Sequence, residues 1–234
     1  MEKPVAIITG AGRGIGRAVA CKLAESKYRL VLVARSHDQL AETAFICGHG
    51  LVAAADVCDE HAVQAVVKQA MKRWGRVDAL VNNAGMARMA SIDQTPADLW
   101  KATIETNLTA AYFFTRAVWP IWRAQGHGVL VNVSSQAARD PFPGMSAYAA
   151  AKAGLNGFSL SLAREGAPIG VRVHVVAPGA TETSMLRASF SKDQFPADQA
   201  MDPAEVADVI VHCVLGDLKY SSGEVIYLRK NAVR

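Results

Sequence analysis

The sequence predicts one α/β domain, a doubly wound parallel sheet of seven strands with helices on both faces. Short apolar runs alternate with segments whose apolar residues recur every three or four positions, the pattern of strands alternating with helices. Several runs, such as residues 29–34, are almost continuously apolar, as in strands buried on both faces. The length of 234 residues is common for one domain of this class, so we expect residues 1–234 to form a single domain.

Local signals support the individual elements in turn. The expected strands lie at residues 5–8, 29–34, 51–55, 78–81, 129–133, 171–176 and 223–228. The expected helices lie at about residues 18–24, 39–47, 60–74, 96–125, 148–165 and 203–215. Asp59 is placed to cap the third helix, Gly75 to end it and Gly126 to end the fourth. After the sixth strand, the chain turns into a long loop at about residues 180–202.

The composition excludes several classes of function. The net charge of +4 is mild and the 25 Lys and Arg residues form no long run, so we expect no nucleic-acid partner. No apolar run has the length of a membrane span, and the first strand begins too early for a signal peptide, so we expect a cytoplasmic protein without a membrane partner. No Cys-x-x-Cys pair occurs, so we expect reduced thiols and no metal site. The four cysteines are Cys21, Cys47, Cys58 and Cys213.

A glycine-rich turn follows the first strand and opens the first helix. Four glycines, Gly10, Gly12, Gly14 and Gly16, fall within seven positions, more than a plain strand-to-helix turn needs. Glycines permit a tight turn, and the unpaired N–H groups of a helix start attract anions, so this arrangement predicts a phosphate site. The spacing is not Gly-x-Gly-x-x-Gly, because Ile15 stands where that motif has glycine, and no triphosphate-binding Gly-Lys-Ser/Thr follows.

The end of the second strand selects the cofactor in dinucleotide-binding folds. An acidic residue there binds the ribose 2′-hydroxyl of NAD, whereas an arginine accommodates the 2′-phosphate of NADP. Ala34 takes the acidic position and Arg35 follows, while Arg13 lies in the glycine turn near the expected ribose. Either arginine alone could be a solvated surface residue, but both together favour NADP(H) over NAD(H). Asp56, at the end of the third strand, is a candidate for the adenine edge or a simple turn residue.

Tyr148 and Lys152 are candidates for proton transfer. They lie four residues apart on an expected helix, so their side chains share a face. An ammonium beside a phenol lowers its pKa, although such pairs also occur as ordinary surface features. Ser134 and Ser135 end the fifth strand; one could hold a substrate carbonyl, or either could be a strand-end or helix-cap serine.

Over nearly its whole length the chain resembles the short-chain dehydrogenase/reductase family. Five motifs carry the resemblance, in the order and spacing of the family. They are Thr-Gly-x-x-x-Gly-x-Gly at residues 9–16, Asn-Asn-Ala-Gly at 82–85, Asn107, Ser135 with Tyr148-x-x-x-Lys152, and Pro178-Gly179 followed by Thr183. The family serine lies thirteen residues before the tyrosine, which selects Ser135 over Ser134.

The resemblance implies a Rossmann-type fold and hydride transfer between a nicotinamide and a carbonyl carbon. It implies Tyr148 as the proton donor, Lys152 as a ribose ligand that lowers the Tyr148 pKa, Ser135 as the carbonyl ligand and Asn107 as the holder of a relay water. In the family, basic residues at the positions of Arg13 and Arg35 mark NADP users. The implied cofactor contacts are Gly10, Gly12, Arg13, Gly14, Ile15, Gly16, Ala34, Arg35, Asp56, Val57, Asn83, Ala84, Gly85, Tyr148, Lys152, Pro178, Gly179, Thr181 and Thr183.

Three places depart from the family pattern. His174 replaces an asparagine, Thr181 replaces an aliphatic residue, and residues 223–230 lack the common Val-Asp-Gly-Gly. The last departure bears on how the carboxyl terminus packs against a neighbouring subunit. Because family members are commonly tetramers, we expect a homo-oligomer, either a tetramer or a dimer.

We therefore expect an NADP(H)-dependent oxidoreductase that reduces a ketone or 3-oxoacyl group of a small carbonyl or acyl thioester substrate. Within the family, the 3-oxoacyl-(acyl-carrier-protein) reductases resemble the chain most in length and in the residues of the motifs. However, residues 169–170 lack the arginine that such reductases often place there for the acidic carrier, so whether an acyl-carrier protein is a partner stays open. The alternative is a catalytically silent NADP-binding sensor, against which the intact catalytic residues argue; sugar-nucleotide epimerases need a longer chain. The candidate pocket residues are Met86, Met89, Gln136, Phe142, Met145, Met185, Leu186, Phe190 and Phe195.

Overall fold

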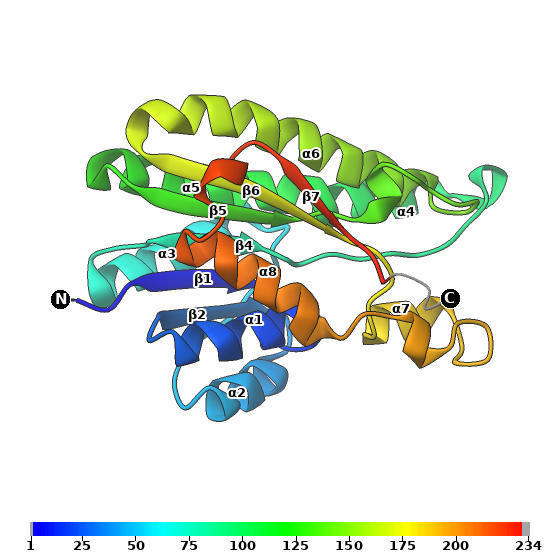
Figure 1. Cartoon of the computed structure of the whole chain (residues 1–234), viewed down its shortest axis with the longest axis horizontal. Coiled ribbons are helices and arrows are strands. Elements are labelled where there is room, and N and C mark those ends of the chain that lie inside the picture. Colours follow the sequence, from blue (N-terminus) through cyan, green and yellow to red (C-terminus); the bar gives the residue numbers. More distant parts are fainter. Residues whose placement is uncertain (1, 231–234) are drawn as a thin grey trace.

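The computed structural model describes residues 2–230, in which seven strands form one parallel sheet (Figure 1). The strand order is β3-β2-β1-β4-β5-β6-β7. The strands are β1 (Val5–Thr9), β2 (Arg29–Ala34), β3 (Leu51–Ala54), β4 (Ala79–Asn82), β5 (Gly128–Val133), β6 (Val171–Pro178) and β7 (Val225–Leu228). Because every neighbouring pair is parallel, all seven carboxyl ends meet at one edge of the sheet.

Helices cover both faces of the sheet, as Figure 1 shows. The helices are α1 (Gly14–Glu25), α2 (His37–Ile46), α3 (Glu60–Trp74), α4 (Ala97–Ile104), α5 (Ala110–Gln125), α6 (Ser146–Gly166), α7 (Ser184–Ser189) and α8 (Pro203–Leu215). Helices α1, α2 and α8 contribute to the apolar core on one face, and α3, α5 and α6 to the core on the other. The prediction of a doubly wound α/β fold is confirmed.

The strand order reverses at β1. The chain proceeds outward from β1 to β3 and then returns to β4, on the other side of β1. Thr9, the last residue of β1, accepts hydrogen bonds through Oγ1 from the N–H groups of Asn83 and Ala84, both at 2.9 Å. The segments after β1 and β4 are therefore held together at the switch point, where ligands bind in folds of this kind.

The expected helix caps occur, but two segments differ from expectation. The Asp59 carboxylate accepts from two N–H groups at the start of α3, and Gly75 ends that helix with φ 70°. The helical stretch expected at residues 96–125 is helical throughout residues 97–125, but a π-helical turn over Glu105–Thr109 interrupts the α-helix and divides it into α4 and α5. No glycine or proline marks that break. The loop expected at residues 180–202 contains the short helix α7, whose N-cap Thr183 accepts from Leu186 N–H.

A charged cluster lies at the opposite edge of the sheet, before the amino ends of β1 and β4. The Asp78 carboxylate accepts from Val5 N–H at 2.8 Å, from Arg76 and from the His127 ring. Burial alone would raise the pKa of Asp78, but hydrogen bonds from these partners outweigh it and lower the pKa below its ordinary value. Elsewhere, no helix within residues 2–230 is both long and apolar enough to cross a membrane.

Candidate active site

Two glycines with left-handed backbone shape the turn between β1 and α1. Gly10 has φ 66° and Gly14 has φ 54°, a region that side chains disfavour. Gly16 lacks a side chain for a different reason, since a Cβ there would lie 2.2 Å from the carbonyl oxygen of Gly10. The N-cap residue Arg13 makes no side-chain cap bond, so the first N–H groups of α1 remain available for an anion.

Arg17 and Thr43 hold this turn from the side of α2. The Arg17 guanidinium donates to Gly12 O at 2.6 Å and to Thr43 Oγ1 at 3.1 Å, and Thr43 Oγ1 donates to Ala11 O at 3.0 Å. The carbonyl groups on the outer side of the turn are thus satisfied by protein. This leaves its N–H side for a ligand.

One helical turn further along the same helix pair, two cysteines meet. Cys21 on α1 and Cys47 at the end of α2 are free thiols whose sulfur atoms are 3.4 Å apart. Burial raises the pKa of Cys47 to about 12, so this thiol stays protonated at neutral pH. The two residues are far apart in the sequence, and their contact exists only because α1 and α2 pack together.

The two arginines expected to select the cofactor line the same cleft. Arg13 precedes α1 and Arg35 follows β2, and both side chains are exposed. Gln39, on α2, lies beside them; a Cβ on Gly12 would be 3.0 Å from its Cβ. Ala34 lines the cleft where an acidic residue would stand in an NAD site. Gln39 had no sequence signal, because only packing brings α2 beside the turn.

Asp56 and Val57 follow β3 and also line the cleft. The Asp56 Oδ1 atom accepts from Cys58 N–H at 2.9 Å, so the residue does form a turn. The two interpretations of Asp56 are therefore compatible, because a carboxylate held by its own turn still presents an oxygen to the cleft.

Tyr148, Lys152 and Ser135 come together where β5 ends and α6 begins. Lys152 is 3% exposed, and its Nζ donates to Val133 O at 2.8 Å. The same Nζ lies 5.7 Å from the centre of the Tyr148 ring. Ser135 lies two residues after β5 and caps a short 3-10 turn, where its Oγ accepts from Ala137 N–H at 3.1 Å. The Oγ of the neighbouring Ser134 donates to Lys152 O at 3.3 Å, and Ser134 also lines the cleft.

Asn107 lies in the π turn and is buried. Its side-chain Nδ2 donates to Met86 O at 2.8 Å and to Thr103 O at 2.9 Å. A Cβ on Gly85 would be 2.8 Å from Asn107 Oδ1 and 3.7 Å from Lys152 Nζ. The amide and the ammonium therefore approach the same point from two helices, and only a glycine fits between them.

Burial is the main influence on the protonation of Tyr148 and Lys152 in the protein alone. Burial raises the pKa of Tyr148 above its ordinary value, and the neighbouring Ser135 hydroxyl offsets this only in part. Burial also lowers the pKa of Lys152 to about 8. The expectation that Lys152, as a ribose ligand, lowers the Tyr148 pKa applies to the cofactor-bound site and stays a prediction; in the protein alone, desolvation is the largest effect on both residues.

The segment after β6 forms the remaining wall. Pro178, Gly179, Thr181 and Thr183 line the cleft. A Cβ on Gly14 would be 3.2 Å from Thr183, so this segment faces the glycine turn across the cleft. The segment is anchored at its base, where Met201 N–H donates to Ala180 O and Glu182 N–H donates to Met201 O, both at 2.9 Å.

Beyond Thr183, Arg187 organises the loop around α7. Its guanidinium pairs with the Glu182 carboxylate. It also donates to Phe195 O at 2.7 Å and to Ser191 O at 3.2 Å. The rings of Phe142, Phe190 and Phe195 pack in sequence, with centroids 6.1 and 6.3 Å apart. Arg187 thereby holds two of these rings against the cleft.

One cleft of about 1190 Å³ joins these parts. All four candidate catalytic residues line it, as do all the candidate cofactor residues except Gly16, which lies behind the turn. Of the candidate substrate residues, Met89 alone does not line it. Arg229 and Lys230, which follow β7, also line the cleft and carried no site prediction.

Comparison with known proteins agrees with this geometry. Residues 4–194 match the family model described as short chain dehydrogenase. The chain is 35% identical to the 3-oxoacyl-[acyl-carrier-protein] reductase FabG of Escherichia coli, over 97% of this chain and 96% of that protein. It is 32% identical to the acetoacetyl-CoA reductase of an Acinetobacter species, over 96% of each chain.

Among solved structures, levodione reductase superposes with a TM-score of 0.91 at 30% identity, covering 97% of this chain and 96% of that one. The family model spans most of the chain, and the relatives cover nearly all of it. The protein belongs to the short-chain dehydrogenase/reductase family of oxidoreductases.

Proposed function

We propose that the protein uses NADP(H) to reduce a ketone or 3-oxoacyl group to a secondary alcohol. The observation that carries this proposal is the gathering of Tyr148, Lys152, Ser135 and Asn107 in one cleft with the glycine turn. The names of the relatives, a 3-oxoacyl-[acyl-carrier-protein] reductase and an acetoacetyl-CoA reductase, support a 3-oxoacyl thioester as substrate. The apolar lining by Met185, Phe190 and other side chains is compatible with an acyl chain.

The residues of the cleft fit a dinucleotide. The N–H groups at the start of α1 suit a pyrophosphate, and a side chain on Gly14 would close the gap toward Thr183. Arg13 and Arg35 are exposed and, within residues 2–230, form no ion pair with a carboxylate. Two guanidinium groups without an ion pair, beside a strand β2 that ends in Ala34 rather than an acidic residue, favour a ribose carrying a 2′-phosphate.

The bound cofactor supplies the hydride that reduces the carbonyl carbon. Tyr148 donates its hydroxyl proton to the carbonyl oxygen, as general acid, and Ser135 orients that oxygen by a hydrogen bond. Burial keeps Tyr148 protonated before reaction, which suits a proton donor. Lys152, held by Val133 O, binds the ribose beside Tyr148 and places a positive charge where the phenolate forms.

Asn107 positions the residues around Lys152. Its amide fixes the backbone of Met86, and the π turn brings it to the same side of Gly85 as Lys152. We propose that it holds a water through which Tyr148 regains its proton by way of Lys152.

A substrate panel tests the proposal. Acetoacetyl thioesters and a set of small ketones and diketones are assayed with NADPH and with NADH, and we expect consumption of NADPH in preference to NADH. Tyr148→Phe should bind NADPH as the wild type does but lose turnover by a hundredfold or more, on the order of general acid catalysis. Absence of turnover on every carbonyl, with tight NADPH binding, would instead identify a cofactor sensor.

A further inference from the structure

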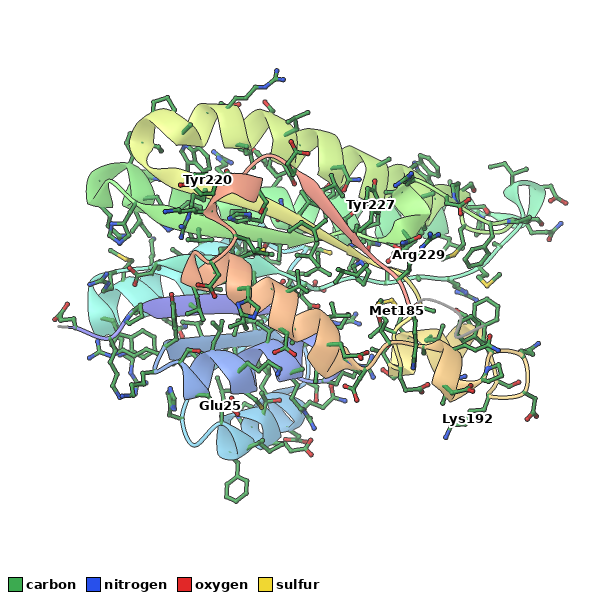
Figure 2. All side chains as sticks on the ribbon, viewed as in Figure 1. Glu25, Met185, Lys192, Tyr220, Tyr227 and Arg229 are labelled. Carbon is green, nitrogen blue, oxygen red and sulfur yellow. The ribbon has the colours of Figure 1, made fainter. Side chains whose placement is uncertain are left out.

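Two exposed, positively charged residues, Arg229 and Lys230, line the cleft after β7. Leu228, the last residue of β7, accepts hydrogen bonds through its carbonyl oxygen from Gly179 N–H at 2.8 Å and from Gln136 Nε2 at 3.3 Å. These contacts fix the segment that continues into Arg229 and Lys230. Both of these residues line the cleft. Figure 2 shows Arg229 at the end of the sheet where Met185 also lies.

Arg229 stands beside the reacting end of the cleft. A Cβ on Gly179 would be 3.6 Å from the Gln136 side chain and 3.8 Å from Arg229 Cβ. Gln136 directly follows Ser135, the residue assigned to the carbonyl. Arg229 therefore borders the space in which the carbonyl-bearing molecule lies.

Neither cation is neutralised by the surrounding protein. Within residues 2–230, the carboxylates form no ion pair with Arg229 or Lys230. Lys230 Nζ donates to Ala200 O at 3.1 Å, which orients the side chain without cancelling its charge. Asp140, whose N–H donates to Gln136 O, also lines the cleft. Arg139 stacks on the ring of Tyr227 in β7 and adds a further positive charge.

We propose that Arg229, assisted by Lys230, forms a subsite for an anionic group, a carboxylate or phosphate, carried by the substrate. The proposal rests on the reductase function above and narrows its substrate class. An unpaired guanidinium at the wall of a largely apolar cleft matches carboxylate and phosphate oxygens in geometry and charge. In the proposed function, the phosphates of the cofactor have other partners, which are the glycine turn, Arg13 and Arg35.

Matched pairs of substrates with the same reacting ketone test this subsite. One pair is acetoacetyl-CoA, which carries phosphates, and its neutral truncation, the acetoacetyl N-acetylcysteamine thioester. The other is acetoacetate and its neutral methyl ester. Steady-state kcat and KM are measured with saturating NADPH for the wild type, Arg229→Gln, Arg229→Lys and Lys230→Gln. Lys192→Gln is the control, because Lys192 is an exposed cation in the loop after α7 and lies outside the cleft (Figure 2).

We expect Arg229→Gln to raise KM about tenfold for at least one anionic substrate. The kcat for that substrate, and the KM for its neutral counterpart, should stay within about twofold of the wild-type values. Arg229→Lys should restore part of the loss, Lys230→Gln should have a smaller effect of the same sign, and Lys192→Gln should have none. An effect confined to acetoacetyl-CoA assigns the subsite to phosphate, and one on acetoacetate assigns it to carboxylate.

If Arg229→Gln changed KM equally for the charged and the neutral substrate of a pair, the subsite would be overturned. So would a matching loss of NADPH affinity in a fluorescence titration, because the cation would then serve the cofactor. If the wild type reduces none of the four substrates, the reductase function fails and the subsite fails with it. An active wild type with an indifferent Arg229→Gln refutes the subsite alone.

Discussion

Replacement of Arg13 or Arg35 by alanine should convert a selective cofactor site into an unselective one. Both side chains are exposed and free of ion pairs within residues 2–230, so a 2′-phosphate would meet them without breaking an existing contact. Hydrogen bonds to charged groups contribute about 1.5–3 kcal/mol. Because solvent screens exposed groups, the lower end applies, about 1.5 kcal/mol for each arginine.

This magnitude predicts about a tenfold weaker Kd for NADPH in each single variant, and up to about a hundredfold in the double variant if the two effects add. The Kd for NADH should change by less than about twofold, because NADH carries no 2′-phosphate. Titration of each variant with both cofactors, followed by nicotinamide fluorescence, measures the two constants. Arg73→Ala, which removes an arginine stacked on Trp74 in α3, is the control.

An equal loss of affinity for NADH and NADPH in these variants would refute the reasoning. That result would mean that the two arginines support the turn itself, as Arg17 does, rather than contact a phosphate. Unchanged binding of NADPH in the double variant would equally remove the physical basis for NADP(H) preference.

Three further predictions follow from burial, charge and close packing. Lys152→Met should abolish turnover. It should also stabilise the cofactor-free protein at about pH 7 by up to about 3 kcal/mol, because the buried ammonium is unfavourable there: burial lowers the Lys152 pKa from 10.5 to about 8. The wild type, unlike the variant, should gain stability as pH rises between these values, because the unfolded chain holds the proton longer; urea unfolding at several pH values measures both effects. Asp78→Asn should remove a contribution to stability that is fully present above the ordinary carboxyl pKa of 3.8 and is lost as pH falls through the lowered folded value. An acid titration that gives the same unfolding midpoint for both proteins would contradict this. Gly16→Ala should lower the free energy of unfolding by about 1–3 kcal/mol and weaken cofactor binding, because its Cβ would meet Gly10 O at 2.2 Å. Gly157→Ala in α6, where a Cβ has open space, should leave binding unchanged in the same titration.

The sheet and most helix boundaries were predictable because they depend on local signals. Continuous apolar runs predicted all seven strands within a few residues, and Asp59 and Gly75 marked α3 at both ends. The site residues were predictable where a motif has fixed spacing, as for Ser135 and Tyr148. All of these signals are carried by neighbours in the chain.

The features of the fold and the candidate site that the sequence did not predict depend on contacts between segments far apart in the chain. The π turn at Asn107 carries no glycine or proline, and its reason is the approach to Met86 and Gly85. The contact of Cys21 with Cys47 requires α1 and α2 to pack together. Arg229 has no motif, and it reaches the cleft only because β7 ends beside Gly179.

The network around Arg187 has a consequence for the thermodynamics of ligand capture. Its hydrogen bonds all join groups within residues 182–195, so the loop is organised by its own side chains before any substrate arrives. The conformational entropy of ordering Phe190 and Phe195 is then lost when the protein folds, and not when it binds. A substrate meets a surface that is already arranged, and more of the free energy of its apolar contacts is expressed as affinity.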